Sequence, residues 1–178
     1  MKKIFKEIII CAAAMALWGT VSANASANVY GVNAEKSANE RSILLEEKGY
    51  SSITAYGEPR GSIISAATIS ITNEGYGKAE ILIETLAQKK SDEIRHVAIL
   101  EKEESDGSWT EIARYDFDAV KEDFENQDLS GLTNQFIVSN LETECYYRVR
   151  GIHYVWLDGK SQAFSTQTEA LLLKKYPG

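Results

Sequence analysis

Cysteine is scarce in this chain of 178 residues, which holds only two, Cys11 and Cys145. Cys11 lies in the N-terminal stretch MKKIFKEIIICAAAMALWGTVSANA, where lysines precede a short apolar run and small residues follow. That order is typical of a secretory signal peptide and predicts residues 1–25 as the signal, with cleavage near Ala25. Cleavage leaves Cys145 alone, so an internal disulfide in the mature chain is excluded.

Long apolar runs are lacking as well. The N-terminal run covers about eleven residues, roughly half of the ~20 that a membrane-spanning helix needs. No second apolar segment appears near the C-terminal LLLKKYPG. We therefore expect a secreted, extracellular protein with no membrane span after signal cleavage.

The chain has no excess of positive charge. Its net charge is −7, and loss of the signal, with three lysines and Glu7, makes the mature charge −9. Nucleic acids and anionic membranes are bound largely through lysine and arginine. The composition therefore excludes both as expected partners.

The sequence also lacks a catalytic constellation. Cys145 and His153 share one face of a predicted strand, but eight residues separate them, about 26 Å along a strand, which is beyond proton-transfer reach. His96 could approach either one only in a register that the sequence does not define. We predict no catalytic residues, no cofactor and no metal ligands, and Cys145 and both histidines are interpreted as structural.

The acidic segment 116–128 leaves one alternative open. Asp116 and Asp118 begin a calcium-loop pattern, but Val120 and Lys121 stand where such a loop needs Asp or Asn and then Gly. A solvated acidic connection is expected, with weak calcium binding as the alternative. Val120 and Phe124 could anchor a short helical turn there.

Alternating apolar and polar residues dominate the chain from residue 63 onward, and no helical stripe is sustained. The pattern predicts seven strands separated by turn residues. The Leu-Asp-Gly-Lys stretch at 157–160 gives the strongest hairpin signal, because Asp and Gly tolerate the positive φ of a tight turn. The predicted strands cover residues 63–72, 78–87, 94–103, 109–117, 134–140, 145–157 and 160–173.

These strands predict one all-β domain, an antiparallel immunoglobulin/fibronectin III-like sandwich, over residues 50–174, with extra pairing from YSSITAYG. About 150 mature residues are enough for one such core. Residues 26–49 form a polar segment between signal and sandwich, in which NERSILLEEKG is either a short helix or disordered.

The strand at 145–157, CYYRVRGIHYVW and Leu157, carries two different faces. If Tyr147 points into the core, the other face must carry two arginines and four large side chains. One interpretation is structural: the arginine heads pair with acids such as Glu101 or Glu103 on a neighbouring strand. The other is a recognition face, since Tyr, Trp and Arg dominate binding hot spots. The candidate binding residues are Tyr146, Arg148, Arg150, Tyr154 and Trp156.

Two resemblances accompany these motifs. NLETECYYRVRGI resembles the sixth strand of fibronectin type III and immunoglobulin-like modules, in which a tyrosine six residues after a leucine fixes the crossing loop with its hydroxyl. Leu141 and Tyr147 have that spacing, and ILEKEESDGSWTEIARY resembles the third and fourth strands. PRGSIIS, YYRVRGIH and STQT also resemble small exported bacterial proteins of an uncharacterised family, a likeness that implies a fold and no activity.

The function expected from the sequence is that of an exported, non-catalytic binding or interaction module for an extracellular protein or a carbohydrate. One alternative is a hydrolase that uses carboxylates from different strands, which needs a deep pocket with two acids about 5–10 Å apart. The other is an exported inhibitor or immunity-like factor that acts through a loop or an edge strand.

Overall fold

The computed structural model describes residues 28–29, 32–33, 41–58, 60–124 and 128–176. The predicted signal peptide lies outside these residues. Strands dominate the described residues, together with a 3-10 helix (Lys121–Asp123). None of the helices found there is long and apolar enough to cross a membrane.

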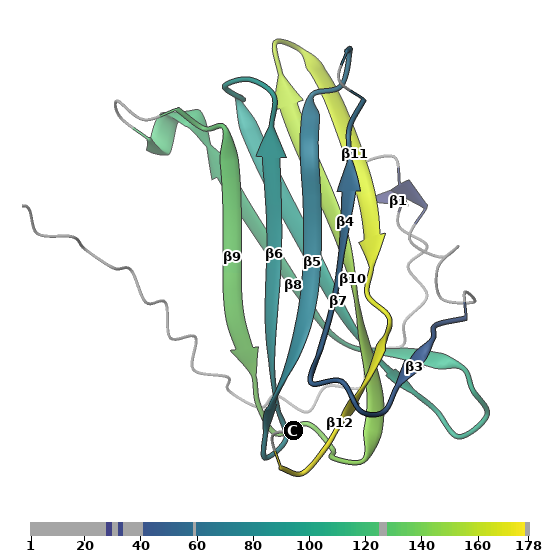
Figure 1. Cartoon of the computed structure of the whole chain (residues 1–178). Helices are drawn as coiled ribbons and strands as arrows, with labels where there is room; N and C mark the ends of the chain where they lie inside the picture. The colour runs from purple at the N-terminus through teal and green to yellow at the C-terminus, as the bar shows by residue number, and fades with distance from the viewer. Residues whose placement is uncertain (1–27, 30–31, 34–40, 59, 125–127, 177–178) are drawn as a thin grey trace, which may run out of the picture.

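One sheet has four antiparallel strands in the order β4-β5-β6-β9. Its members are β4 (Tyr50–Tyr56), β5 (Ile64–Gly75), β6 (Lys78–Ala87) and β9 (Gly131–Val138). Figure 1 shows these four strands side by side as one layer, with β7, β8 and β10 crossing behind them.

The second sheet has the order β3-β12-β10-β7-β8, and β11 also pairs with β10. Every pair in it is antiparallel except that of β3 with β12, which is parallel. Two short strands, β1 (Asn28–Val29) and β2 (Val32–Asn33), pair separately. The second sheet is built from β3 (Leu44–Leu45), β7 (Glu93–Glu103), β8 (Trp109–Val120), β10 (Cys145–Leu157), β11 (Lys160–Gln167) and β12 (Ala170–Leu173).

The predicted all-β antiparallel sandwich is confirmed. The first, second and fifth of the seven predicted strands form one sheet, and the third, fourth, sixth and seventh form the other. This is the division of an immunoglobulin/fibronectin III-like sandwich. Strands β7, β8 and β10 take the third, fourth and sixth places, and β4 adds the extra pairing expected of YSSITAYG.

The turns follow the local chemistry of the sequence. Asp158 and Gly159 both have positive φ, 49° and 74°, and close the hairpin between β10 and β11. Only a few residue types adopt this backbone region without cost, so Asp-Gly defines the turn. The expected helical turn after β8 is present as the 3-10 helix.

Two expectations need correction. The predicted strand 160–173 is two strands, because the Thr168 hydroxyl accepts a hydrogen bond from the Val149 N–H (3.0 Å), where a ladder carbonyl would otherwise stand. The short helix considered for NERSILLEEKG is absent from residues 41–49, which instead supply β3 to the second sheet.

The core lies between the sheets in two apolar clusters. One gathers around Ile69, Ile81 and Leu100, and the other around Ile64, Ile94 and Val155. The inward positions between them on β6, β7 and β10 hold polar side chains, Thr85, His96 and His153, which are at most 1% exposed.

Candidate functional site

Strand β10 orients its side chains as predicted. Tyr147 is 1% exposed and packs in the core cluster with Val149. Its hydroxyl donates a hydrogen bond to the Glu142 carbonyl at 3.0 Å, which anchors the loop that leads into β10. Burial raises the pKa of Tyr147 to about 12, so the hydroxyl stays a donor at any physiological pH. This is the contact that the Leu141–Tyr147 spacing implied.

The Tyr147→Phe variant should therefore lose about 0.5–1.5 kcal/mol of unfolding free energy, because the part-buried hydrogen bond to the Glu142 carbonyl is lost. Urea unfolding measures this loss. The control is Tyr50→Phe, whose ring is 53% exposed and which should change stability by less than about 0.5 kcal/mol. Equal effects of the two substitutions would mean that the Tyr147 hydroxyl does not hold this loop.

The opposite face of β10 carries a closed ionic cluster of Arg148, Arg150 and Glu101, which we call the arginine cluster. Arg148 Nε donates to Glu101 Oε2 at 2.6 Å, and Arg150 Nε donates to Oε1 at 2.9 Å. Arg150 also reaches Oε1 through its terminal nitrogen at 2.8 Å. The exposed fractions of the three residues are 0%, 6% and 1%. One carboxylate thus lies between two guanidinium groups, out of contact with solvent.

Two further residues complete the surroundings of Arg148. Its guanidinium carbon lies 4.2 Å from the ring centroid of Trp109 on β8, a cation–π contact. Its terminal nitrogen donates to Ser42 Oγ at 3.0 Å. The register explains the assembly, because Arg148 and Glu101 are directly opposed across β10 and β7.

For Arg148 and Arg150, the arginine cluster favours the interpretation as structural ion pairs over the interpretation as a recognition face. The expected pairing of the arginines with an acid on a neighbouring strand is what the structure shows, and the acid is Glu101. Neither guanidinium is open to a ligand from solvent at the exposures observed. The sequence placed both arginines on the outer face correctly but did not reveal that this part of the face is covered.

The three aromatic candidates on the same face remain partly accessible. Trp156 is 38% exposed, and Tyr154 and Tyr146 are half-buried. Tyr154 and Trp156 alternate at the C-terminal end of β10, whereas Tyr146 lies about 26 Å away along the strand, beyond the arginine cluster. Only Tyr154 and Trp156 therefore lie close enough to act together.

The two histidines of the chain are held inside the sandwich. His96 and His153 face each other across β7 and β10, and each of their ring nitrogens is hydrogen-bonded within the protein. Burial raises the pKa of the half-buried Cys145 thiol, which disfavours the reactive thiolate. Cys145, expected inside the core, is half-buried and packs against the core cluster at its margin.

Sequence reasoning missed the partners of the histidines, which are Thr85, Asn134 and Thr166. Thr85 was detectable, since it interrupts the inward row of Ala79, Ile81, Ile83 and Ala87 on β6. Thr166 and Asn134 carried no such signal, because Ser, Thr and Asn are common throughout their strands.

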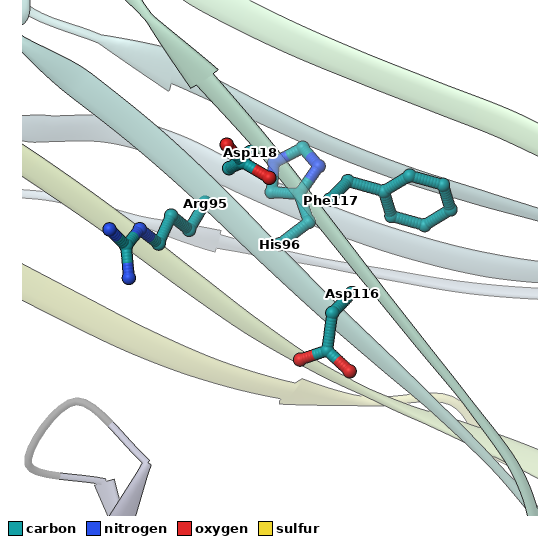
Figure 2. A pocket seen from close by; sticks show the side chains of 5 residues that line it. All are labelled: Arg95, His96, Asp116, Phe117 and Asp118. Atoms are coloured by element: carbon teal, nitrogen blue, oxygen red, sulfur yellow. The ribbon is translucent and has the colours of Figure 1, made fainter.

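A hollow of about 240 Å³ lies at β7 and β8. Figure 2 shows the side chains of Arg95, Asp116 and Asp118 pointing in different directions rather than toward a common point. Asp116 is 58% exposed and is bound by Arg114 at 3.0 and 3.2 Å. The carboxylates of this hollow therefore lack the converging geometry that the hydrolase alternative requires.

No set of three or more metal-ligating side chains occurs in the part of the chain that the structure describes. Asp128, at the end of the acidic segment considered for calcium, forms an ion pair with Lys90 at 2.7 Å. Residues 125–127 of that segment lie outside the described residues, and weak calcium binding there stays a hypothesis.

Comparison with known proteins gives partial likeness to solved structures. No family model matches the chain, and no curated protein matches it. Among solved structures, the selenomethionine-substituted chicken interferon gamma receptor alpha chain is similar over 61% of this chain, with 10% identity and a TM-score of 0.34. The match spans half of that receptor chain.

Proposed function

We propose that the chain is an exported, non-catalytic binding module whose contact surface is the C-terminal end of β10. Tyr154 and Trp156 are the contact residues of this surface, which we call the aromatic end. Arg148 and Arg150, and Tyr146 beyond them, support the strand rather than touch the partner. The partner is an extracellular protein or a carbohydrate, the two classes for which tyrosine and tryptophan platforms are suited.

The observation that carries this proposal is the exposure of Trp156 on a face whose other central residues are buried. Val97, Ile99 and Ile152, which also point outward, are at most 2% exposed. On β11, Trp156 is opposed by the small residue Ser161, and the half-buried Tyr154 is opposed by Ala163. Tryptophan and tyrosine are enriched among the residues that contribute most binding energy at protein interfaces.

The state of the histidines supports a non-catalytic role. A general base needs a ring nitrogen within hydrogen-bond reach of its substrate. All four ring nitrogens of the two histidines in this chain are already bonded internally.

Capture of a partner tests the proposal. The mature protein, immobilised, is exposed to culture medium and solubilised cell envelope, in parallel with a Tyr154→Ala/Trp156→Ala variant. The matched control is Tyr56→Ala, which removes a ring that is 78% exposed on the other sheet. We expect a component retained by the unaltered protein and the control and depleted at least tenfold by the double variant, with all three folded by circular dichroism.

The identity of the captured component separates the alternatives. A polysaccharide or matrix protein fits a binding module, and a single stoichiometric enzyme fits an inhibitor. A contact surface at the aromatic end would be contradicted if the double variant retained the component as well as the unaltered protein does. It would also be contradicted if the unaltered protein retained no component.

A further inference from the structure

The two histidines form a direct pair in the middle of the core. His96 on β7 and His153 on β10 are cross-strand partners, 1% and 0% exposed. Their ring centroids are 5.6 Å apart, in an edge-to-face arrangement. Both rings point toward the four-stranded sheet, where Thr85 on β6 lies between them.

One chain of hydrogen bonds runs through this pair and joins the sheets. His96 Nδ1 lies 2.7 Å from Asn134 Oδ1, and His96 Nε2 lies 2.8 Å from Thr85 Oγ1. The same Thr85 oxygen lies 2.9 Å from His153 Nδ1, and His153 Nε2 lies 2.8 Å from Thr166 Oγ1. Thr85 and Asn134 belong to one sheet, and the histidines and Thr166 belong to the other.

The donor and the acceptor of each bond in this row of hydrogen bonds can be assigned. Asn134 Oδ1 only accepts, so His96 Nδ1 donates to it and the Nε2 of a neutral ring accepts from the Thr85 hydroxyl. Thr85 has no second hydrogen, so its oxygen accepts from His153 Nδ1–H, and His153 Nε2 accepts from the Thr166 hydroxyl. Every polar atom in the row is satisfied when both rings are neutral.

A proton added to either ring disrupts this order. On His96 Nε2 it would turn the Thr85 hydroxyl out of its bond, and on His153 Nε2 it would do the same to Thr166. Either proton would also place a charge in the buried interior between the sheets, and a second proton would put two positive charges within about 6 Å of each other.

Among the described strands, no opposite charge faces the pair. No carboxylate occupies an inward position on the described strands that surround the pair. These strands are β7 and β10 themselves together with β4, β5, β6, β8, β9, β11 and β12. Glu84 contributes only its backbone carbonyl to His153. The titratable side chains at these inward positions are Lys102, Tyr115, Cys145, Tyr147 and Lys160.

We propose that the pair His96–His153 is an acid-sensitive latch between the two sheets: the neutral rings hold the sheets together, and in mildly acidic medium the rings take up protons only as the sheets separate. Gly151 fits this role, since a Cβ there would lie 2.7 Å from Thr166 Oγ1 and 2.9 Å from His153 Nε2. The inference is independent of the partner bound at the aromatic end.

The direction of the pH dependence follows from the two states. Burial lowers the pKa of His96 to about 4, and burial together with the neighbouring His96 lowers the pKa of His153 to about 3. In the unfolded chain both titrate near 6.5. Below that pH the unfolded state binds more protons, so the stabilisation present above pH 6.5 is lost as the pH falls toward 4.

The test combines two measurements on the mature protein. Urea unfolding between pH 7.5 and pH 4.5 should show the folding equilibrium constant falling by up to about tenfold per pH unit for each histidine below pH 6. Nuclear magnetic resonance of the histidine ring protons, over the same range, should show neither ring of the folded protein titrating.

A His96→Gln/His153→Gln variant is the third arm, since amides donate and accept hydrogen bonds but do not titrate in this range. If it folds, its equilibrium constant should change less than tenfold from pH 6.5 to pH 4.5, and the unaltered protein's should change more. The proposal would be overturned if either histidine ring titrated near pH 6.5 in the folded protein. It would also be overturned if the folding equilibrium constant of the folded variant fell with pH as steeply as that of the unaltered protein. If the variant does not fold, the two measurements on the unaltered protein decide the question alone.

Discussion

Replacing Glu101 by Gln is expected to lower the unfolding free energy by about 3–5 kcal/mol, since breaking a buried ion pair leaves an uncompensated charge. Here two guanidinium groups would lose their shared carboxylate, while the amide keeps the size of the side chain. Arg148 has no exposed surface and cannot turn to water without opening the face between β7, β8 and β10. Guanidinium chloride unfolding followed by tryptophan fluorescence measures the loss.

Glu103→Gln is the matched control for this prediction. Glu103 lies two residues along β7 on the same face, opposite Trp109, and is half-buried. Its neutralisation should change stability by less than about 0.5 kcal/mol, as is usual for surface charges. A Glu101→Gln protein as stable as the Glu103→Gln protein would show that the arginine cluster is not closed in solution.

The second large effect is expected at Gly151, where alanine should destabilise the protein by about 2–3 kcal/mol. The added Cβ would meet Thr166 Oγ1 at 2.7 Å, His153 Nε2 at 2.9 Å and Ile69 Cδ1 at 3.2 Å. The first two atoms are hydrogen-bonded to each other, so neither can move without breaking that bond. Overpacking of this kind costs about 1–3 kcal/mol, and a broken buried hydrogen bond adds to it.

Gly49→Ala provides the comparison for that substitution. Nothing lies within 4 Å of a Cβ added at Gly49. Loss of glycine freedom in the unfolded chain should therefore leave this variant unchanged or stabilise it by up to about 1 kcal/mol. Thermal unfolding of both variants is the measurement, and similar melting temperatures would argue against close packing around Gly151.

The sequence predicted the sandwich because its strands obey local rules. Alternation on β6 and β10 placed Tyr147 inside and Arg148 outside without any knowledge of the partner strands. The Asp158–Gly159 turn then limited how β10 and β11 could pair. Both features depend on residues close together in the chain, so they can be predicted from the sequence.

The arginine cluster and the histidine pair could be predicted only in part from the sequence, because both depend on the register between β7 and β10. Alternation tells which face a residue occupies but not which residue of a distant strand opposes it. A shift of two residues would keep every face and yet pair Arg148 with Glu103 instead of Glu101. Likewise, only the actual register brings His96 opposite His153.

Arginine modification of the folded mature protein shows whether the charged face of β10 is closed on itself. Phenylglyoxal labelling with mass-spectrometric mapping compares Arg148 and Arg150, whose side chains are 0% and 7% exposed, with Arg95 and Arg114, at 39% and 34%. We predict labelling of Arg95 and Arg114 and protection of Arg148 and Arg150 until the protein is unfolded. Labelling of Arg148 or Arg150 in the folded protein at the rate of Arg114 would contradict the account.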